Sequence, residues 1–371
     1  MILAGARVVT PTGVLDPGWL QIEDGRISAV GPGAPPTSGT DLGGAWVLPG
    51  YVDLHVHGGG GGSIDESAEG LATSVAFHRQ HGTTRTLASL VTADADHMEA
   101  GIRWIAEAVR RGPGPDGHVV GAHLEGPFLS AARCGAQDTD AMLDPDPALL
   151  RRFLAAGPVR MVTVAPERAG GVEMVRQLAE AGVIPAIGHS DAHFPDAAAA
   201  VEAGARVVTH TFNGMRGLHH RDPGIAGVIG PSSLVCEAIN DGEHLHDAVV
   251  RLLSRLVGDR LCFVTDAMAA AGIGDGSYRL GKREVRVENG KATLVETGSI
   301  AGSTLTMERA VARAVREVGL PIEVAARAAA TTPARVLGGD FGALIPGYDA
   351  DLVVLDDELA VTKVMAQGGW S

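Results

Sequence analysis

The stretch YVDLHVHGGGGG, residues 51–62, places two histidines one residue apart at the end of an apolar run, and five glycines follow. Because side chains alternate along a β-strand, His55 and His57 project from the same face. The pair could bind a metal ion, or the strand could lead into a glycine-rich phosphate loop. A phosphate loop typically carries a GK[ST] or GxGxxG pattern before a helix. The segment GGGGGSIDES lacks the lysine, so it favours metal ligands and a close-packed glycine segment.

Eight apolar, strand-like runs of this kind occur between residues 49 and 341, separated by alanine-rich segments with helical periodicity. Eight β/α units with near-continuous apolar strands predict an α/β fold of the (β/α)8 TIM-barrel type for residues 49–341. The two chain ends, residues 1–48 and 342–371, show short strand and turn patterns instead, with Asp24-Gly25 at a hairpin position. We expect these ends to form one small β-sandwich domain. Residues 278–296 predict an inserted hairpin with Asn289-Gly290 at its turn.

The composition is that of a globular protein, with 371 residues, 45% hydrophobic and 20% charged. No apolar run approaches the roughly 20 residues of a transmembrane helix, and the start lacks a signal peptide's basic region. The three cysteines fit no disulfide framework. We therefore expect a cytoplasmic protein with no membrane partner. A net charge of −14 without a basic stripe argues against nucleic acid.

Polar residues end several of the predicted strands, which is where barrel enzymes carry their chemistry. A lone strand-end histidine is more often a hydrogen-bonded structural residue than a ligand. Here several strands end this way, and their ends converge in a barrel. The candidates are His55, His57, Glu125, His189, His210 and Asp266. Glu167 and Asp241 also end strands, and Glu167 is expected to hydrogen-bond within the barrel. The histidines interpreted as structural are His78, His81, His97, His118, His123, His193, His219 and His246.

Imidazole and carboxylate ligands suit zinc or a similar first-row divalent ion. A catalytic site keeps one position open for water, whose pKa falls to about 7 on the metal. Asp266, as a carboxylate not committed to the metal, is the candidate general base and general acid. The chain has three lysines, Lys282, Lys291 and Lys363, and none ends an apolar strand. Schiff-base chemistry and a lysine-carbamate metal bridge are therefore disfavoured.

Seven motifs, in order, carry a family resemblance: HLEGPF, GHS, THTFNGM, RDPGIAG, INDGEHLH, VTDAM and IAGSTLTM. With the tail GALIPGYDADLVVLD they make the chain similar to the amidohydrolase superfamily, and within it to the N-acetylglucosamine-6-phosphate deacetylase family. The resemblance covers nearly the whole chain. It implies hydrolysis of the acetamide of N-acetylglucosamine 6-phosphate to glucosamine 6-phosphate and acetate, in amino-sugar catabolism and cell-wall recycling.

The resemblance also implies roles for single residues. Glu125, His189 and His210 match the principal metal ligands. His55 and His57 match a pair that some members have, which suggests a second metal with Glu125 between the two. One or two divalent ions per subunit are expected, zinc first, with iron, manganese and cobalt as alternatives. Asp266 matches the catalytic acid/base.

The phosphate end of the substrate is implied in the same way. Asn213 and the backbone N–H of Gly214 match groups at the substrate phosphate. Arg221 and His244 match phosphate contacts that, in relatives, reach in from the neighbouring subunit, which implies a homodimer. Gln137 stands where many relatives have a histidine that contacts the sugar and the amide carbonyl, and Cys134 where a lysine is common. Gln137 can donate a hydrogen bond but cannot carry charge, so its role and the substrate preference stay open.

Other functions remain open beside this one. The nearest is deacetylation of another phosphorylated amino sugar, N-acetylgalactosamine 6-phosphate. A cyclic-amide hydrolase or a deaminase is a broader alternative, although Arg221 and Asn213 favour a phosphate. A metal-binding scaffold without catalysis is disfavoured because Asp266 is retained together with all five candidate ligands.

Overall fold

The computed structural model describes residues 1–114 and 117–371. Its middle is a sheet of eight strands in sequence order, and every neighbouring pair is parallel. The strands are β6 (Tyr51–Val56), β9 (Thr83–Leu90), β10 (Val119–Glu125), β11 (Val159–Val164), β12 (Ile184–Ile187), β13 (Val207–Val208), β14 (Val235–Ala238) and β15 (Leu261–Phe263). The Asp266 N–H donates to the His55 carbonyl at 2.8 Å and links the end of the last strand to the first. The predicted barrel is confirmed, and all eight apolar runs supply its strands.

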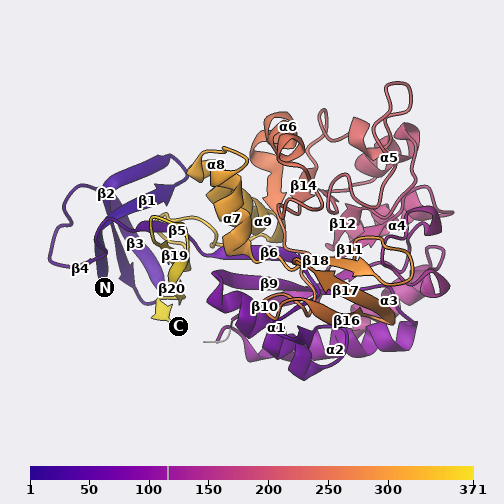
Figure 1. Cartoon of the computed structure of the whole chain (residues 1–371), viewed down its shortest axis with the longest axis horizontal. Coiled ribbons are helices and arrows are strands. Elements are labelled where there is room, and N and C mark those ends of the chain that lie inside the picture. Colours follow the sequence, from indigo (N-terminus) through magenta and orange to yellow (C-terminus); the bar gives the residue numbers. More distant parts are fainter. Residues whose placement is uncertain (115–116) are drawn as a thin grey trace.

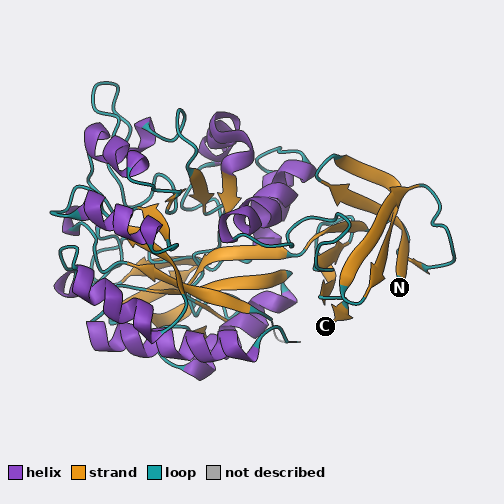
Figure 2. Cartoon of the chain, turned by 180° about the vertical axis from the view of Figure 1, so that it is seen from behind, coloured by secondary structure: helices purple, strands orange, loops and turns teal. Residues whose placement is uncertain are grey.

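Helices surround these strands (Figure 2). They are α1 (Ala68–Gln80), α2 (Ala95–Arg111), α3 (Pro147–Ala156), α4 (Gly171–Glu180), α5 (Phe194–Glu202), α6 (Asp247–Val257), α7 (Met307–Arg316), α8 (Ile322–Ala326) and α9 (Thr332–Leu337). A π-helical turn, η5 (Arg327–Thr331), joins α8 to α9. The connection from β13 to β14 departs from the repeat, because it carries the short 3₁₀ turn η3 (Ile225–Gly227) in place of an α-helix. Further 3₁₀ turns are η1 (Ala131–Arg133), η2 (Thr139–Ala141) and η4 (Gly258–Arg260).

Strand β6 shows how the sequence pattern positions the site. Val52, Leu54 and Val56 belong to the main hydrophobic core. The alternate residues Asp53 and His55 are fully buried as well, but they contact polar side chains: Thr265 just beyond β15, and Glu237 in β14. One face of the strand therefore packs on apolar groups while the other carries polar groups into the barrel.

Both chain ends contribute to a second sheet, which lies beside the barrel with the two termini close together (Figure 1). The strands are β1 (Ile2–Thr10), β2 (Gly13–Glu23), β3 (Arg26–Pro32), β4 (Thr40–Asp41), β5 (Trp46–Pro49), β19 (Leu352–Leu355), β20 (Val361–Ala366) and β21 (Gly369–Trp370). This unit has its own apolar core, which includes Leu3, Leu20 and Leu352. The prediction of one β-rich unit from both ends is confirmed, whereas its division after residues 48 and 341 stays a prediction.

The inserted segment near the barrel's end forms a three-stranded antiparallel sheet of β16 (Gly276–Leu280), β17 (Arg283–Glu288) and β18 (Lys291–Leu294). Asn289 and Gly290 both have positive φ between β17 and β18, as a tight hairpin turn requires. The apolar face of this sheet packs against Met268 and Val91. The predicted hairpin is confirmed, with a third strand added.

The glycines after His57 form a two-stranded ribbon, β7 (Gly58–Gly59) with β8 (Gly62–Ser63). A Cβ atom on Gly58 would lie 2.6 Å from the Gly62 carbonyl oxygen and 2.7 Å from the Ala269 nitrogen. Backbone atoms cannot yield as a flexible side chain would, so glycine is required for this close packing. No helix in the described part of the chain combines the length and apolarity needed to cross a membrane.

Candidate active site

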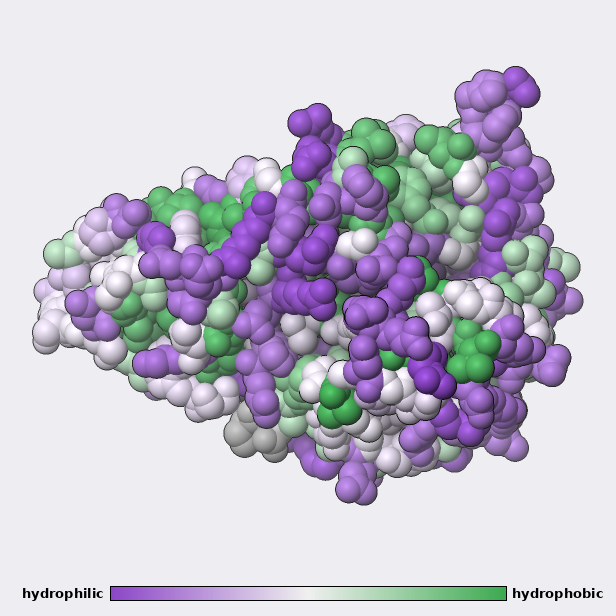
Figure 3. Space-filling view, viewed as in Figure 1, coloured by the Kyte–Doolittle hydropathy of each residue, from purple (hydrophilic) through white to green (hydrophobic). Residues whose placement is uncertain are grey.

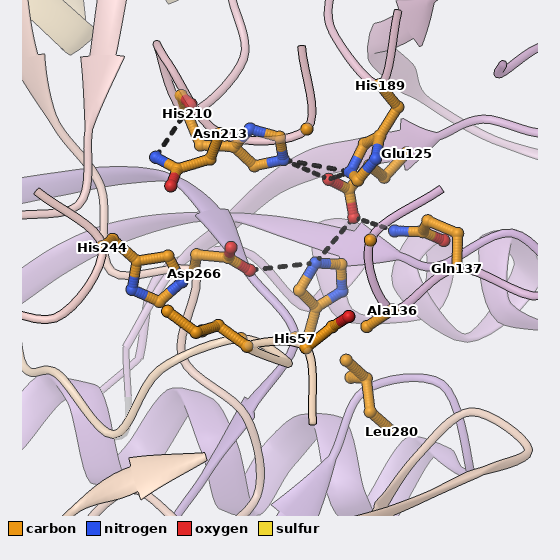
Figure 4. Close-up of a pocket in the computed structure, with 15 residues that line it drawn as sticks. His57, Glu125, Ala136, Gln137, His189, His210, Asn213, His244, Asp266 and Leu280 are labelled. Atoms are coloured by element: carbon orange, nitrogen blue, oxygen red, sulfur yellow. Dashed lines mark hydrogen bonds and ion pairs between the residues drawn. The ribbon is translucent and has the colours of Figure 1, made fainter. Parts of the chain in front are cut away.

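A cavity of about 270 Å³ opens at the carboxyl ends of the barrel strands. Four candidate residues follow or end different strands: Glu125 ends β10, and His57, His189 and His210 lie one or two residues beyond β6, β12 and β13. Their side chains point toward one another, with Asp266 beside them (Figure 4). His55 lies deeper and is fully buried.

The first group that could hold a metal ion is Glu125, His189 and His210. The Nε2 atoms of both histidines lie 3.0 Å from Glu125 Oε1 and 3.1 Å from each other. All three side chains are at least 93% buried.

The second group is His55, His57 and Asp266. The two histidine Nε2 atoms lie 3.0 Å apart, and Asp266 Oδ1 lies 3.6 Å from the first and 3.4 Å from the second. Glu125 Oε2 lies 3.2 Å from His57 Nε2, so this carboxylate faces both groups with different oxygens. Asp266 therefore lies next to the histidine pair, and its role as a carboxylate not committed to the metal stays a prediction.

The spacing of these ligand atoms fits a divalent cation. Four imidazole nitrogens converge on one carboxylate, and the paired Nε2 atoms lie 3.0 and 3.1 Å apart. A tetrahedral zinc ion with bonds of 2.0–2.1 Å holds its ligands about 3.3 Å apart. Nitrogen lone pairs this close would repel each other unless a proton or a cation lay between them.

The electrostatics also favour a cation. Burial by itself would lower the pKa of His55, but Glu125 and Asp266 raise it well above its ordinary value. Burial would raise the pKa of Glu125, yet the His55 and His189 rings hold it well below its ordinary value. The site therefore attracts positive charge, which a divalent ion supplies in place of protons.

Three of the strand-end residues have backbone conformations that side chains rarely adopt. The φ angles of His189, His210 and Asp266 are 45°, 27° and 47°. Such residues cost roughly 1–3 kcal/mol each and cluster at functional sites, where the surrounding structure enforces them.

The cavity is also lined by Asn213, Gly214 and His244. The Asp241 carboxylate holds His244, because it accepts the His244 backbone N–H at 2.9 Å and lies 2.7 Å from its ring Nδ1. This turn directs the ring into the chain's own cavity, which corrects the expectation that His244 reaches a neighbouring active site. Arg221 does not line the cavity; it lies exposed on the loop between β13 and η3.

The chain resembles known proteins along nearly its whole length. Residues 46–370 match the model of the Amidohydrolase family. The chain belongs to the amidohydrolase family. It is 46% identical to N-acetyl-D-glucosamine-6-phosphate deacetylase from Mycobacterium smegmatis. An aspartate-to-alanine variant of that protein, in complex with N-acetyl-D-glucosamine-6-phosphate, superposes with a TM-score of 0.96 over 100% of this chain and 98% of that chain.

Two further relatives cover most of this amidohydrolase. An N-acetylgalactosamine-6-phosphate deacetylase from Escherichia coli O157:H7 is 36% identical over 99% of this chain and 98% of its own length. An N-acetylglucosamine-6-phosphate deacetylase from Vibrio furnissii is 35% identical over 93% of this chain and 88% of its own length.

Gln137 has a well-defined orientation in this amidohydrolase. Its Oε1 accepts the Thr92 N–H at 2.8 Å, so its amide nitrogen turns to Glu125 and donates to Oε2 at 2.5 Å. One of its two amide hydrogens is thereby committed to the carboxylate, which leaves the second for the cavity.

Sequence reasoning missed several residues of the site. Glu237 is fully buried within β14, and its Oε2 lies 3.3 Å from His55 Nδ1. A charged residue inside the apolar run SLVCEAIND was a signal that could have found it. Leu280 reaches the cavity from β16, and no pattern in the inserted hairpin marked it; Ile300 reaches it from beyond β18, as the first residue of the IAGSTLTM motif.

The supporting residues lie as expected. His123 bonds within the barrel, with Nδ1 2.9 Å from Ser89 Oγ and Nε2 2.9 Å from Thr163 Oγ1, and burial holds its pKa well below the ordinary value. Glu167 accepts hydrogen bonds from Ser190 Oγ and the Asp191 N–H, as the sequence predicts. Neither side chain lines the cavity.

Proposed function

We propose that this amidohydrolase hydrolyses the acetamide of N-acetylglucosamine 6-phosphate to glucosamine 6-phosphate and acetate. The observation that carries the proposal is one small cavity lined both by the metal-ligand groups and by the Asn213–Gly214 turn with His244. A volume of about 270 Å³ lies just below the usual range of ligand pockets and suits a ligand as small as a monosaccharide. The likeness to a deacetylase solved with this sugar phosphate supports the same substrate class.

Zinc is the metal that we propose, in one or two positions per subunit. Glu125, His189 and His210 would hold the first ion, and His55 and His57 the second, with Glu125 between them. A bound divalent ion polarises a carbonyl oxygen and lowers the pKa of water to about 7. Iron, manganese and cobalt accept the same ligands, because metal identity depends on geometry and availability as well as on donors.

Asp266 moves the proton in the proposed mechanism. Its carboxylate lines the cavity and takes a proton from the water that attacks the amide carbon. It then gives this proton to the nitrogen as the C–N bond breaks, because an unprotonated amide nitrogen leaves poorly. The free amide hydrogen of Gln137 donates to the oxygen on which negative charge develops.

Asn213, the Gly214 N–H and His244 would bind the phosphate, far from the bond that breaks. Such remote contacts orient the acetamide and contribute binding energy to the reaction. The Asp241 hydrogen bond raises the pKa of His244 despite its burial, which favours a cationic ring beside a phosphate.

We further propose a homodimer in which Arg221 completes the phosphate site of the partner subunit. In support, Arg221 is exposed, and apolar atoms gather around α6, where Leu252 and Leu256 are 60% and 48% exposed (Figure 3). The three cysteines carry no disulfide, which agrees with the cytoplasmic location that we propose.

The test compares acetate release from three substrates after the metal equivalents per chain are measured. The substrates are N-acetylglucosamine 6-phosphate, the same sugar without phosphate, and N-acetylgalactosamine 6-phosphate. We expect the highest kcat/KM for the first and a large loss without phosphate. An unchanged kcat/KM without phosphate would refute the substrate assignment.

Two other outcomes would assign a different function. The galactosamine epimer remains the second candidate because the relative from Escherichia coli O157:H7 carries that name, and a higher kcat/KM on it would reverse the preference. A metal-loaded protein that releases no acetate from any of the three sugars would indicate a scaffold.

A further inference from the structure

Glu237 lies beneath both ligand groups and belongs to neither. It is fully buried in β14. Its Oε2 accepts the His210 backbone N–H at 3.1 Å and lies 3.3 Å from His55 Nδ1. One oxygen atom thus contacts a ligand of each candidate metal position.

The rest of the surroundings explain why this contact matters. Within the described residues, Oε1 of Glu237 has no hydrogen-bond partner, and the only ion-pair partner of the carboxylate is the His55 ring. A buried carboxylate without a compensating cation is strongly unfavourable. Its compensation must come through His55, whose Nε2 faces the cavity side of the barrel while Nδ1 faces Glu237.

Among the four ligand histidines, His55 is the one whose second ring nitrogen meets a carboxylate in the described structure. His189 Nδ1 lies 2.9 Å from the Arg133 carbonyl oxygen, whereas His57 Nδ1 and His210 Nδ1 have no partner. A carboxylate on the second nitrogen fixes the tautomer of a ligand imidazole and raises its basicity.

We propose that Glu237 is a positioning residue of the metal centre, which holds His55 through its ring and His210 through its backbone. This inference rests on the metal-dependent function proposed above. With its Nδ1–H donated to Glu237, His55 presents an unprotonated Nε2 to the cation. The bond to the His210 N–H helps to hold a residue whose φ of 27° is otherwise unfavourable.

The test measures metal retention in the holoenzyme, so its readout is independent of activity. Purified protein is equilibrated in zinc buffers of decreasing free zinc, and zinc per chain is counted. The step that depends on His55 is identified as the one that His55→Ala abolishes. Glu237→Gln keeps the shape but removes the charge, and we expect it to shift this step to 10–100-fold higher free zinc.

Asp53→Asn is the matched control. Asp53 is an equally buried barrel carboxylate that accepts the His55 backbone N–H at 3.2 Å but makes no hydrogen bond or ion pair with the ring in the described structure. We expect a shift of less than about twofold. An equal shift in both variants, or no shift in Glu237→Gln, would overturn the inference, as would a wild type without any His55-dependent step.

A second measurement needs no variant at position 237. In the holoenzyme with 15N-labelled histidine, the His55 Nδ1–H should exchange slowly with solvent, and its signal should be absent in His55→Ala. An unprotonated Nδ1 would overturn the inference even if Glu237→Gln failed to fold. Acetate release by the wild type tests the proposed function separately: an inactive wild type that shows the expected zinc shift would refute only that function.

Discussion

Replacing Asp266 with asparagine should nearly abolish hydrolysis, and the structure indicates how large the loss will be. The side chain is 11% exposed, and its Oδ1 lies 3.4 Å from His57 Nε2 and 3.6 Å from His55 Nε2. Asparagine has the same shape, so the cavity should persist. The substitution removes the carboxylate that we propose takes and returns the proton.

General acid–base catalysis contributes about 10²–10⁴-fold to the rate, and each tenfold corresponds to about 1.36 kcal/mol. Because the same carboxylate serves both halves of the reaction, we expect the upper part of this range, a loss of about 10³–10⁴-fold in kcat. KM should change little, because Asp266 is not among the residues that we propose to bind the phosphate. The metal that we propose for Glu125, His189 and His210 should remain, since Asp266 is not in that group.

The assay is steady-state acetate release, with zinc counted in the same samples. The matched control is Asp259→Asn, because Asp259 precedes the strand that Asp266 follows and pairs with Arg335 at the exposed opposite end of the barrel. That variant should keep its activity within about twofold. A kcat for Asp266→Asn within tenfold of the wild type, at equal metal content, would refute the acid–base assignment.

Three further predictions concern stability. Burial lowers the pKa of His78 from 6.5 to about 4. The folded protein therefore resists protonation of this ring more than the unfolded chain does, so its contribution to the free energy of unfolding is full above pH 6.5 and is lost as pH falls toward 4. The melting temperature of the wild type should therefore fall more between pH 7 and pH 5 than that of His78→Gln. An equal fall in both proteins would contradict this. Gly58→Ala should destabilise the fold by about 1–3 kcal/mol through overpacking. Gly217→Ala is the control, because its new methyl group would have nothing within 4 Å. Equal melting temperatures of the two variants would show that the β7–β8 ribbon can adjust to the added methyl group. Arg85 bonds Asp351 at 2.9 Å and Asp349 at 2.5 Å across the junction of the barrel and the β-rich unit. Arg85→Met should lower the free energy of unfolding, measured by chemical denaturation, by about 3–5 kcal/mol. The control Arg316→Met breaks an exposed pair with Glu358 and should lower it by less than about 1 kcal/mol. Similar losses in the two variants would argue against a buried ion pair at the junction.

Much of the candidate site could be predicted because barrel topology makes distant strand ends neighbours. His57, Glu125, His189 and His210 lie far apart in sequence, yet each ends or follows an apolar strand, and the carboxyl ends of such strands meet at one face. Counting strands therefore sufficed to bring these four residues together.

Other features depended on contacts that no local pattern encodes. The sequence could not place His244, because the Asp241 hydrogen bonds that turn its ring inward form only once the loop has folded. It could not orient Gln137 either, since its amide is held by Thr92 from one strand end and Glu125 from another.

The sequence by itself determined the barrel, the β-rich unit from both ends and the residues with ligand chemistry, because hydrophobic periodicity and residue type are local properties. Only the tertiary structure decided that Asp266 lies beside the His55–His57 pair and that Glu237 contacts the second ring nitrogen of His55. Those relations are distances between side chains on different strands. They are set by the register and packing of the closed barrel and not by any single segment.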